Sequence, residues 1–88
     1  MFSISKLKES SFLVYGLGLS GKSVVNFFKK NNINNYEIWD DKQKQLFKNK
    51  RTKNLTKTLN KVDYIVLSPG ISLIAKKNLI KFKKKIII

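Results

Sequence analysis

GLGLSGKS, residues 16–23, is the stretch that decides the fold, because it fits two different phosphate-binding loops. Read as G-x-x-x-x-G-K-S/T it is a P-loop, in which Lys22 and Ser23 hold a triphosphate and its magnesium ion. Read as G-x-G-x-x-G it is the glycine loop of a Rossmann-type sheet. Both loops place a phosphate at the start of a helix, so the surrounding sequence has to decide between them.

Apolar runs and helical patterns alternate on both sides of this loop. Strands are expected at 12–15, 36–40, 62–67 and 85–88, and helices at 20–31 and 71–82, with a loop and a short helix between 42 and 61. Ser20 is expected to cap the first helix. Strands that alternate with helices predict an α/β fold, here a Rossmann-like open parallel sheet of about four strands with flanking helices. Because the sequence ends inside an apolar run, we expect an incomplete or truncated domain.

The glycine spacing and a following carboxylate favour the Rossmann loop. In that loop Gly16 permits the bend, Gly18 lets a phosphate approach, and Gly21 packs the helix against the strand. Asp40 lies nineteen residues after Gly21 at the end of the second strand, where a ribose hydroxyl is held. The P-loop stays open as an alternative, because Asp40 or Asp41 could bind the magnesium ion that a P-loop requires.

A second motif lies on the same edge of the predicted sheet. Ser68-Pro-Gly-Ile71 follows the third strand, and its backbone amides precede a helix. Such a turn lets a ligand approach closely and presents amides to an anion or a base. The alternative is an ordinary strand-to-helix turn.

Composition limits the possible functions. The 88 residues make at most one small domain, with no cysteine, no histidine and a formal net charge of +14. The missing residue types remove thiolate metal sites and the commonest general base, and we expect no metal site and no catalytic residue in this chain. The positive charge would permit nucleic acid as a partner. Arginine is the residue that most often contacts base edges, and the chain has only one, so we do not expect a nucleic-acid partner. We expect a cytoplasmic protein without a membrane span.

Three motifs in this order and spacing resemble the N-terminal domain of the Mur ligases. They are Gly16-Leu-Gly-Leu-Ser-Gly21, Asp40-Asp-Lys42 and Val66-Leu-Ser-Pro-Gly-Ile71, and the likeness covers nearly the whole chain. Within the family the sequence is most similar to the ligases that join D-glutamate to UDP-N-acetylmuramoyl-L-alanine. The resemblance implies one domain over residues 1–88 that binds the UDP part of this substrate. The central ATPase and C-terminal ligase domains of the parent enzyme, with its ATP and Mg²⁺, are expected to be absent.

The resemblance also implies which residues meet the substrate. Leu19 and Ser20 would bind the diphosphate beside Gly18 and Gly21, and Asp40, Asp41 and Lys42 would meet the uridine. Ser68, Gly70 and Ile71 would border the uracil site. Asp41 and Lys42 depart from the Thr and Arg that relatives often carry.

Three other interpretations remain open. The chain could be a regulatory module that binds NAD or a similar dinucleotide, or a basic nucleic-acid-binding protein with Trp39 and the tyrosines as stacking surfaces. It could also be a nonfunctional remnant of a ligase gene. We expect Trp39 to belong to the core, because it alternates with Tyr36 and Ile38 in a strand.

Overall fold

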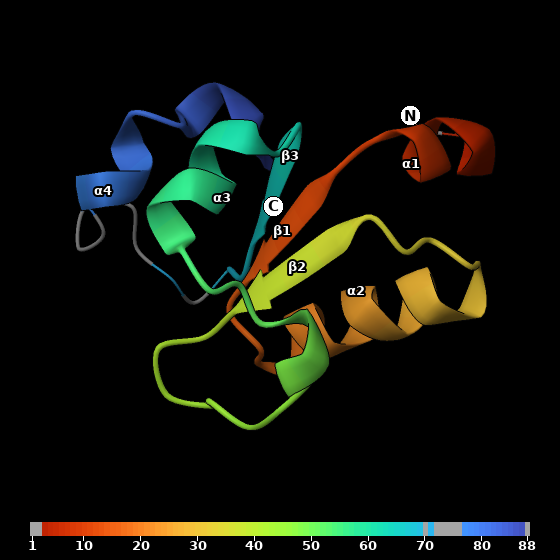
Figure 1. The fold of residues 1–88 in the computed structure, drawn as a ribbon, viewed down its shortest axis with the longest axis horizontal. Coiled ribbons are helices and arrows are strands. Elements are labelled where there is room, and N and C mark those ends of the chain that lie inside the picture. Colours follow the sequence, from red (N-terminus) through yellow and green to blue (C-terminus); the bar gives the residue numbers. More distant parts are fainter. Residues whose placement is uncertain (1–2, 70, 72–76, 88) are drawn as a thin grey trace.

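A four-stranded sheet forms the centre of the structure, a computed structural model that describes residues 3–69, 71 and 77–87. The strands are β1 (Phe12–Tyr15), β2 (Tyr36–Trp39), β3 (Tyr64–Leu67) and β4 (Ile86–Ile87). Their order across the sheet is β2-β1-β3-β4, and every neighbouring pair is parallel (Figure 1). The expected Rossmann-like parallel sheet is therefore confirmed.

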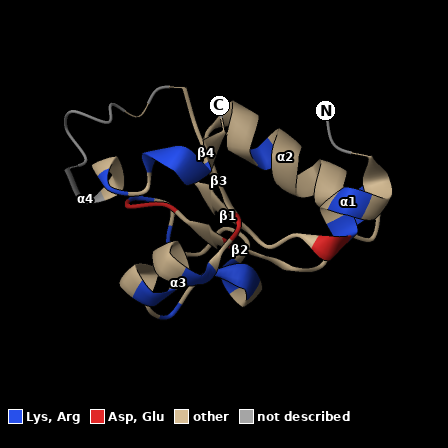
Figure 2. Cartoon of the chain, turned by 90° about the horizontal axis from the view of Figure 1, so that it is seen from above, with Lys and Arg blue, Asp and Glu red and all other residues tan. Residues whose placement is uncertain are grey.

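Helices lie on both faces of this sheet. The described residues form α1 (Ile4–Glu9), α2 (Leu19–Lys30), α3 (Leu55–Lys61), α4 (Lys77–Ile80) and the 3-10 helices η1 (Lys48–Lys50) and η2 (Lys83–Lys85). α2 packs on one face, whereas α3 and α4 lie on the other, as the view from above shows (Figure 2). Cover on both faces explains why the central strand β1 is a continuous apolar run.

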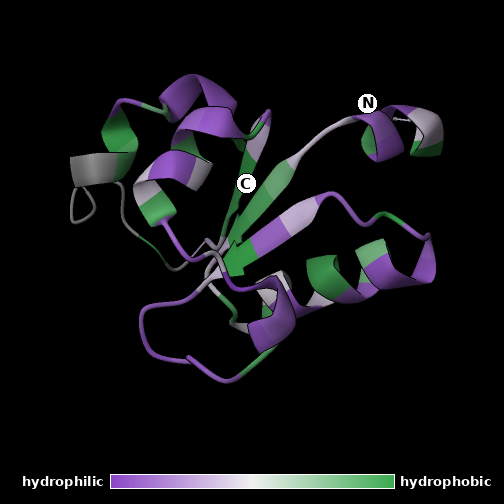
Figure 3. Ribbon diagram, viewed as in Figure 1, coloured by the Kyte–Doolittle hydropathy of each residue, from purple (hydrophilic) through white to green (hydrophobic). Residues whose placement is uncertain are grey.

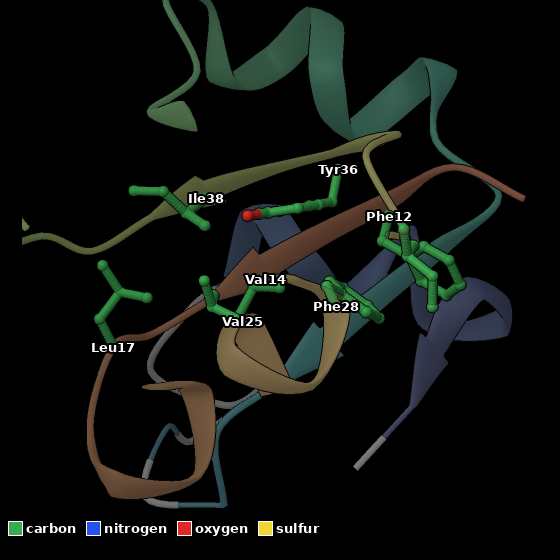
Figure 4. Packing of buried hydrophobic residues seen from close by; sticks show 8 residues of the cluster. Phe12, Val14, Leu17, Val25, Phe28, Tyr36 and Ile38 are labelled. Atoms are coloured by element: carbon green, nitrogen blue, oxygen red, sulfur yellow. The ribbon is translucent and has the colours of Figure 1, made fainter. Parts of the chain in front are cut away.

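β1 is buried on both faces because its side chains alternate between two cores. Hydropathy follows this arrangement, since β1 and β3 are hydrophobic and the long loop after β2 is hydrophilic (Figure 3). The first core, between the sheet and α2, contains Phe12, Val14, Leu17, Val25, Phe28, Ile33, Tyr36 and Ile38 (Figure 4). The second, under α3 and α4, contains Leu13, Tyr15, Leu59, Val62, Ile65, Leu67, Leu79 and Phe82. Trp39 packs against the second core, as expected from its place in the strand.

The register brings the ends of three strands to one edge. Tyr15, Trp39 and Leu67 are direct neighbours across the sheet. The residues that follow these strands therefore meet at the carboxyl edge, where open α/β sheets bind their ligands. This edge joins the glycine loop to segments that lie far away in the sequence.

Two local features at the first helices differ from the sequence-based expectations. α1 was not expected; none of its residues is buried, and Leu7 packs only partly buried against the first core. It forms on local hydrogen bonds: Ser3 caps its first turn, and the Ser10 hydroxyl donates to the Lys6 carbonyl oxygen at 2.8 Å. Ser20 is not the cap of α2, since the helix already begins at Leu19 with Gly18 in the capping position.

The remaining boundaries follow from hydrogen bonding. The 42–61 region forms η1 and α3, and Val62 ends α3, so β3 begins only at Tyr64. The expected 71–82 helix falls partly outside the described residues, and its described part is α4. The expected terminal strand is present as β4. Among the helices in the described part of the chain, none combines the length and apolar character that a membrane span needs.

Candidate functional site

Two glycines of the loop after β1 are required by the protein itself. Gly16 has a φ of +100°, which side-chain-bearing residues rarely adopt, and its amide donates to the Trp39 carbonyl oxygen at 2.7 Å. Gly21 lies in the first turn of α2 against the loop, and a Cβ there would collide with the Gly16 carbonyl oxygen. Gly16 thus makes the bend and Gly21 closes the helix onto the strand.

Gly18 has no such structural reason to be glycine. Its φ of −75° and ψ of −162° are open to any residue, and an added Cβ would meet no described atom within 4 Å. The space beside Gly18 is the kind that a glycine leaves for a group from outside the chain.

The helix that starts at this position has unsatisfied amides at its first turn. Within the described residues no side chain caps α2, whereas Ser3 caps α1 and Asn54 caps α3 through side-chain oxygens. The amides of Leu19 and Ser20 therefore stand at the positive end of a twelve-residue helix. Such an end is suited to a negatively charged group.

Asp40, immediately after β2, holds the glycine loop in place. Its Oδ2 accepts the Leu17 amide at 2.7 Å, and its Oδ1 accepts the amides of Lys42 and Gln43, both at 2.8 Å. Gln43 completes the arrangement, because its Nε2 donates to the Leu17 carbonyl oxygen at 2.7 Å. Both sides of Leu17 are thus tied to the segment that follows β2.

The charge of Asp40 is stabilised by these contacts. Burial alone raises the pKa of its carboxyl group, but the three backbone amides and the nearby Arg51 guanidinium outweigh burial, so the pKa lies below its ordinary value. Arg51 donates to the Asp40 carbonyl oxygen at 3.0 Å, and its guanidinium lies 4.2 Å from the centre of the Trp39 ring. The Trp39 indole donates in turn to Asp41 at 2.8 Å.

Two adjoining hollows open at this edge of the sheet. The larger, about 370 Å³, is lined by Gly16, Gly18, Leu19, Ser20, Asp40, Ser68, Pro69 and Ile71. The smaller, about 170 Å³, is lined by Tyr15, Gly16, Asp40, Asp41, Lys42 and Ile71. They share Gly16, Asp40 and Ile71, so the glycine loop, the end of β2 and the turn after β3 surround one region.

Most of the predicted contact residues meet here. Eight of the ten line the two hollows. Gly21 does not line them, because it is buried between α2 and the loop. Gly70 lies outside the described residues. The sequence analysis did not identify Gln43 or Arg51. No motif points to Gln43. Arg51 could have been noticed because it is the only arginine in the chain.

The side chains of a P-loop do not come together in this structure. The Ser23 hydroxyl donates to the Leu19 carbonyl oxygen of its own helix at 3.0 Å. Asp63 lies before β3, at the opposite edge of the sheet, where it accepts from the Ser11 amide at 2.9 Å. The carboxylate of Asp40 is occupied by backbone amides. Asp41, the other acid considered for magnesium, accepts from the Trp39 indole at 2.8 Å.

The parallel sheet, the glycine loop and the uncapped helix define a Rossmann-like α/β domain. The sequence profile of the family described as Mur ligase MurD-like, N-terminal domain, matches residues 10–87. The chain belongs to this family.

A curated relative supports this assignment. The chain is 41% identical over 68 aligned residues to UDP-N-acetylmuramoylalanine–D-glutamate ligase of Buchnera aphidicola subsp. Schizaphis graminum (strain Sg). The alignment covers 68% of this chain but only 15% of that ligase. No solved structure matches the chain.

Proposed function

We propose that this chain binds the UDP part of UDP-N-acetylmuramoyl-L-alanine. Its parent would be an ATP-dependent ligase that adds D-glutamate to this substrate during peptidoglycan synthesis in the cytoplasm. Membership of the MurD-like family and the name of the Buchnera relative support the proposal. In this proposal the piece alone binds substrate without catalysis. ATP, Mg²⁺ and the joining step belong to other domains of the parent.

The observation that carries the proposal is the uncapped start of α2 beside Gly18. The amides of Leu19 and Ser20 head the helix, and the space next to Gly18 is open. A diphosphate is the part of the substrate that such a helix end attracts. Asp41, Lys42 and Ile71 line the adjoining smaller hollow, which leaves that region for the uridine.

The position of Asp40 bears on the alternative of a dinucleotide module. In a typical NAD site the corresponding carboxylate holds the ribose hydroxyls. Here both carboxylate oxygens already accept backbone amides from the loop and from the residues that follow Asp40. The Asp40 carboxylate therefore shapes the loop, and because uridine and NAD both carry a ribose, the titration of UDP against NAD below decides between them.

An amide NMR titration of the 88-residue chain tests the proposal. UDP-N-acetylmuramoyl-L-alanine, UDP, NAD and ATP–Mg²⁺ are added in separate experiments. We expect the two UDP compounds to bind most tightly and to shift the amides of 18–20, 40–42, 68 and 71. Ser23→Ala is the matched control, because the Ser23 hydroxyl bonds only within its own helix in the described structure.

Each other outcome contradicts the proposal in a specific way. Preference for NAD would assign the chain to the dinucleotide modules. Preference for ATP–Mg²⁺ that is lost in Ser23→Ala would restore the P-loop interpretation. A well-dispersed spectrum that no ligand changes would mean that the fold is present without its binding function.

A further inference from the structure

A third hollow, of about 430 Å³, lies along the outer edge of β2, away from the glycine loop. It is open to solvent and is bordered by β2, η1 with the segment that follows it, and α3. Five cations line it: Lys50, Arg51, Lys53, Lys57 and Lys61. Glu37 is the single acid in its lining, and none of these six residues lines the two hollows at the carboxyl edge. Figure 2 shows Lys residues along α3.

The positive charge in this hollow is largely uncompensated. Glu37 pairs with Lys61 at 2.9 Å and so neutralises one cation. Lys53 and Lys57 are exposed, and within the described part of the chain neither has an ion-pair partner. Like charges around one concave surface repel each other, and an anion between them removes that repulsion.

Two of the cations are held by contacts within the chain, and Arg51 also lies near the Asp40 carboxylate. Lys50 donates to the Asn34 carbonyl oxygen at 2.8 Å and lies 4.6 Å from the centre of the Tyr36 ring. Arg51 donates to the Asp40 carbonyl oxygen at 3.0 Å and stacks on Trp39. Because these contacts already restrict both side chains, a ligand that meets them loses less conformational entropy on binding.

The use of arginine at this position also points to an oxyanion. The chain has 19 Lys and Arg residues, of which Arg51 alone is arginine. A guanidinium presents five donors in a planar fork that fits phosphate oxygens, and its contact with Asp40 uses the Nη1 nitrogen. Lys53 and Lys57 line the same hollow and are exposed.

We propose that this hollow binds a small anion that carries two or more phosphate groups. A single charge would leave the remaining cations facing one another, whereas several phosphates match them. The volume of about 430 Å³ lies within the range of small-molecule pockets. The proposal is independent of the function proposed for the glycine loop, because the two sites share no lining residue.

Inorganic triphosphate, titrated into the 88-residue chain in 150 mM NaCl, is the probe that tests this site. Amide NMR shows which residues respond. We expect saturable shifts at residues 50–57, with a Kd below about 1 mM. Lys53→Ala/Lys57→Ala should weaken this binding at least about tenfold. The matched control is Lys6→Ala/Lys8→Ala, which removes the same charge from two exposed positions on α1 and should leave the affinity within about twofold.

Three results would overturn the proposal. Equal weakening in both double variants would mean diffuse attraction by the whole chain. Shifts confined to 18–20 would place the triphosphate at the glycine loop and leave the function proposed for that loop intact. Tighter binding of a single-stranded oligonucleotide, with shifts that spread beyond the hollow, would identify a nucleic-acid surface instead.

Discussion

The three glycines of the loop serve different purposes, so alanine substitutions should separate folding from binding. Gly21→Ala forces a methyl group onto the Gly16 carbonyl oxygen, and we expect the free energy of unfolding to fall by at least about 2 kcal/mol. Gly18→Ala adds a methyl group where no described atom lies within 4 Å, so stability should change by less than about 0.5 kcal/mol. Its affinity for UDP should fall roughly tenfold.

Urea unfolding and a UDP titration of both variants check this pair of expectations. Full UDP affinity in Gly18→Ala would contradict the assignment of the open space to a phosphate. A large loss of stability in the same variant would show that Gly18 has a structural role after all.

Asp40 makes part of the stability depend on pH. Its pKa is lowered in the folded protein, so its contribution is present above the unfolded value of about 3.9 and is lost as the pH falls through the folded value. We expect the urea midpoint of the wild-type chain to exceed that of Asp40→Asn at pH 7. The difference should shrink on acidification below about pH 4, because protonation removes the carboxylate. A difference that stays constant down to pH 2.5 would contradict this assignment.

Gln43 should act as a positioning residue for the glycine loop. Gln43→Ala removes the donor to the Leu17 carbonyl oxygen, and we expect a loss of about 1 kcal/mol in stability together with a severalfold weaker binding of UDP. Gln45→Ala is the matched control, because Gln45 is also exposed and lies only two residues further on. Gln43→Asn keeps the amide group on a shorter side chain. We expect that this side chain does not reach the Leu17 carbonyl oxygen and does not restore the hydrogen bond. Equal UDP affinity in wild type and Gln43→Ala would contradict this role.

At the scale of elements, the sequence predicted what burial determines and missed what local hydrogen bonds determine. β1 and the interior of α2 follow from apolar runs and helical spacing, because both pack into cores. α1 has no buried residue, so its pattern carries no signal of a helix. The true start of α2 depends on the geometry of the loop and not on the presence of a capping side chain.

The side-chain caps of α1 and α3 should contribute differently to the free energy of unfolding. Asn54 caps α3, which contributes Thr58 and Leu59 to the buried interior, so Asn54→Ala should lower the free energy of unfolding by about 1 kcal/mol. Ser3→Ala should cost less than about 0.5 kcal/mol in global unfolding, because α1 has no buried residue and only its partly buried Leu7 packs against a core. Urea unfolding measures the global effect, and amide hydrogen exchange should show that α1 opens locally in Ser3→Ala. Equal global losses would mean that α1 unfolds together with the rest.

At the scale of the whole molecule, the meeting of the three motifs at one edge was predictable but the hydrogen bonding within the candidate site was not. The glycine loop, Asp40 and Ser68 each follow a strand. Because β1, β2 and β3 are parallel neighbours, these three segments lie at the same edge of the sheet. One partner of the Asp40 carboxylate is a peptide amide 23 residues away, at Leu17. Every residue has such an amide, so no pattern of side chains indicates which one a carboxylate will accept.

Net charge should make the fold more stable as salt is added. The chain carries 19 basic and 5 acidic residues, and among the described residues one ion pair joins Lys61 to Glu37. The molecule extends 33 × 28 × 23 Å, so at 0.01 M NaCl, where the Debye length is about 30 Å, charges across its whole width repel each other. At 0.15 M the Debye length is about 8 Å, and most of this repulsion is screened.

We therefore expect the free energy of unfolding to rise by about 1 kcal/mol between these two salt concentrations, or roughly 4–8 °C in Tm. Thermal unfolding followed by circular dichroism measures the change. Lys6→Ala/Lys8→Ala should reduce the salt effect slightly, and Lys53→Ala/Lys57→Ala should reduce it more, because its two lysines face other cations across one hollow. Stability that falls with added salt would mean that attractive pairs outweigh the repulsion. Equal reductions in the two double variants would mean that the repulsion is spread evenly over the molecule and is not concentrated beside β2.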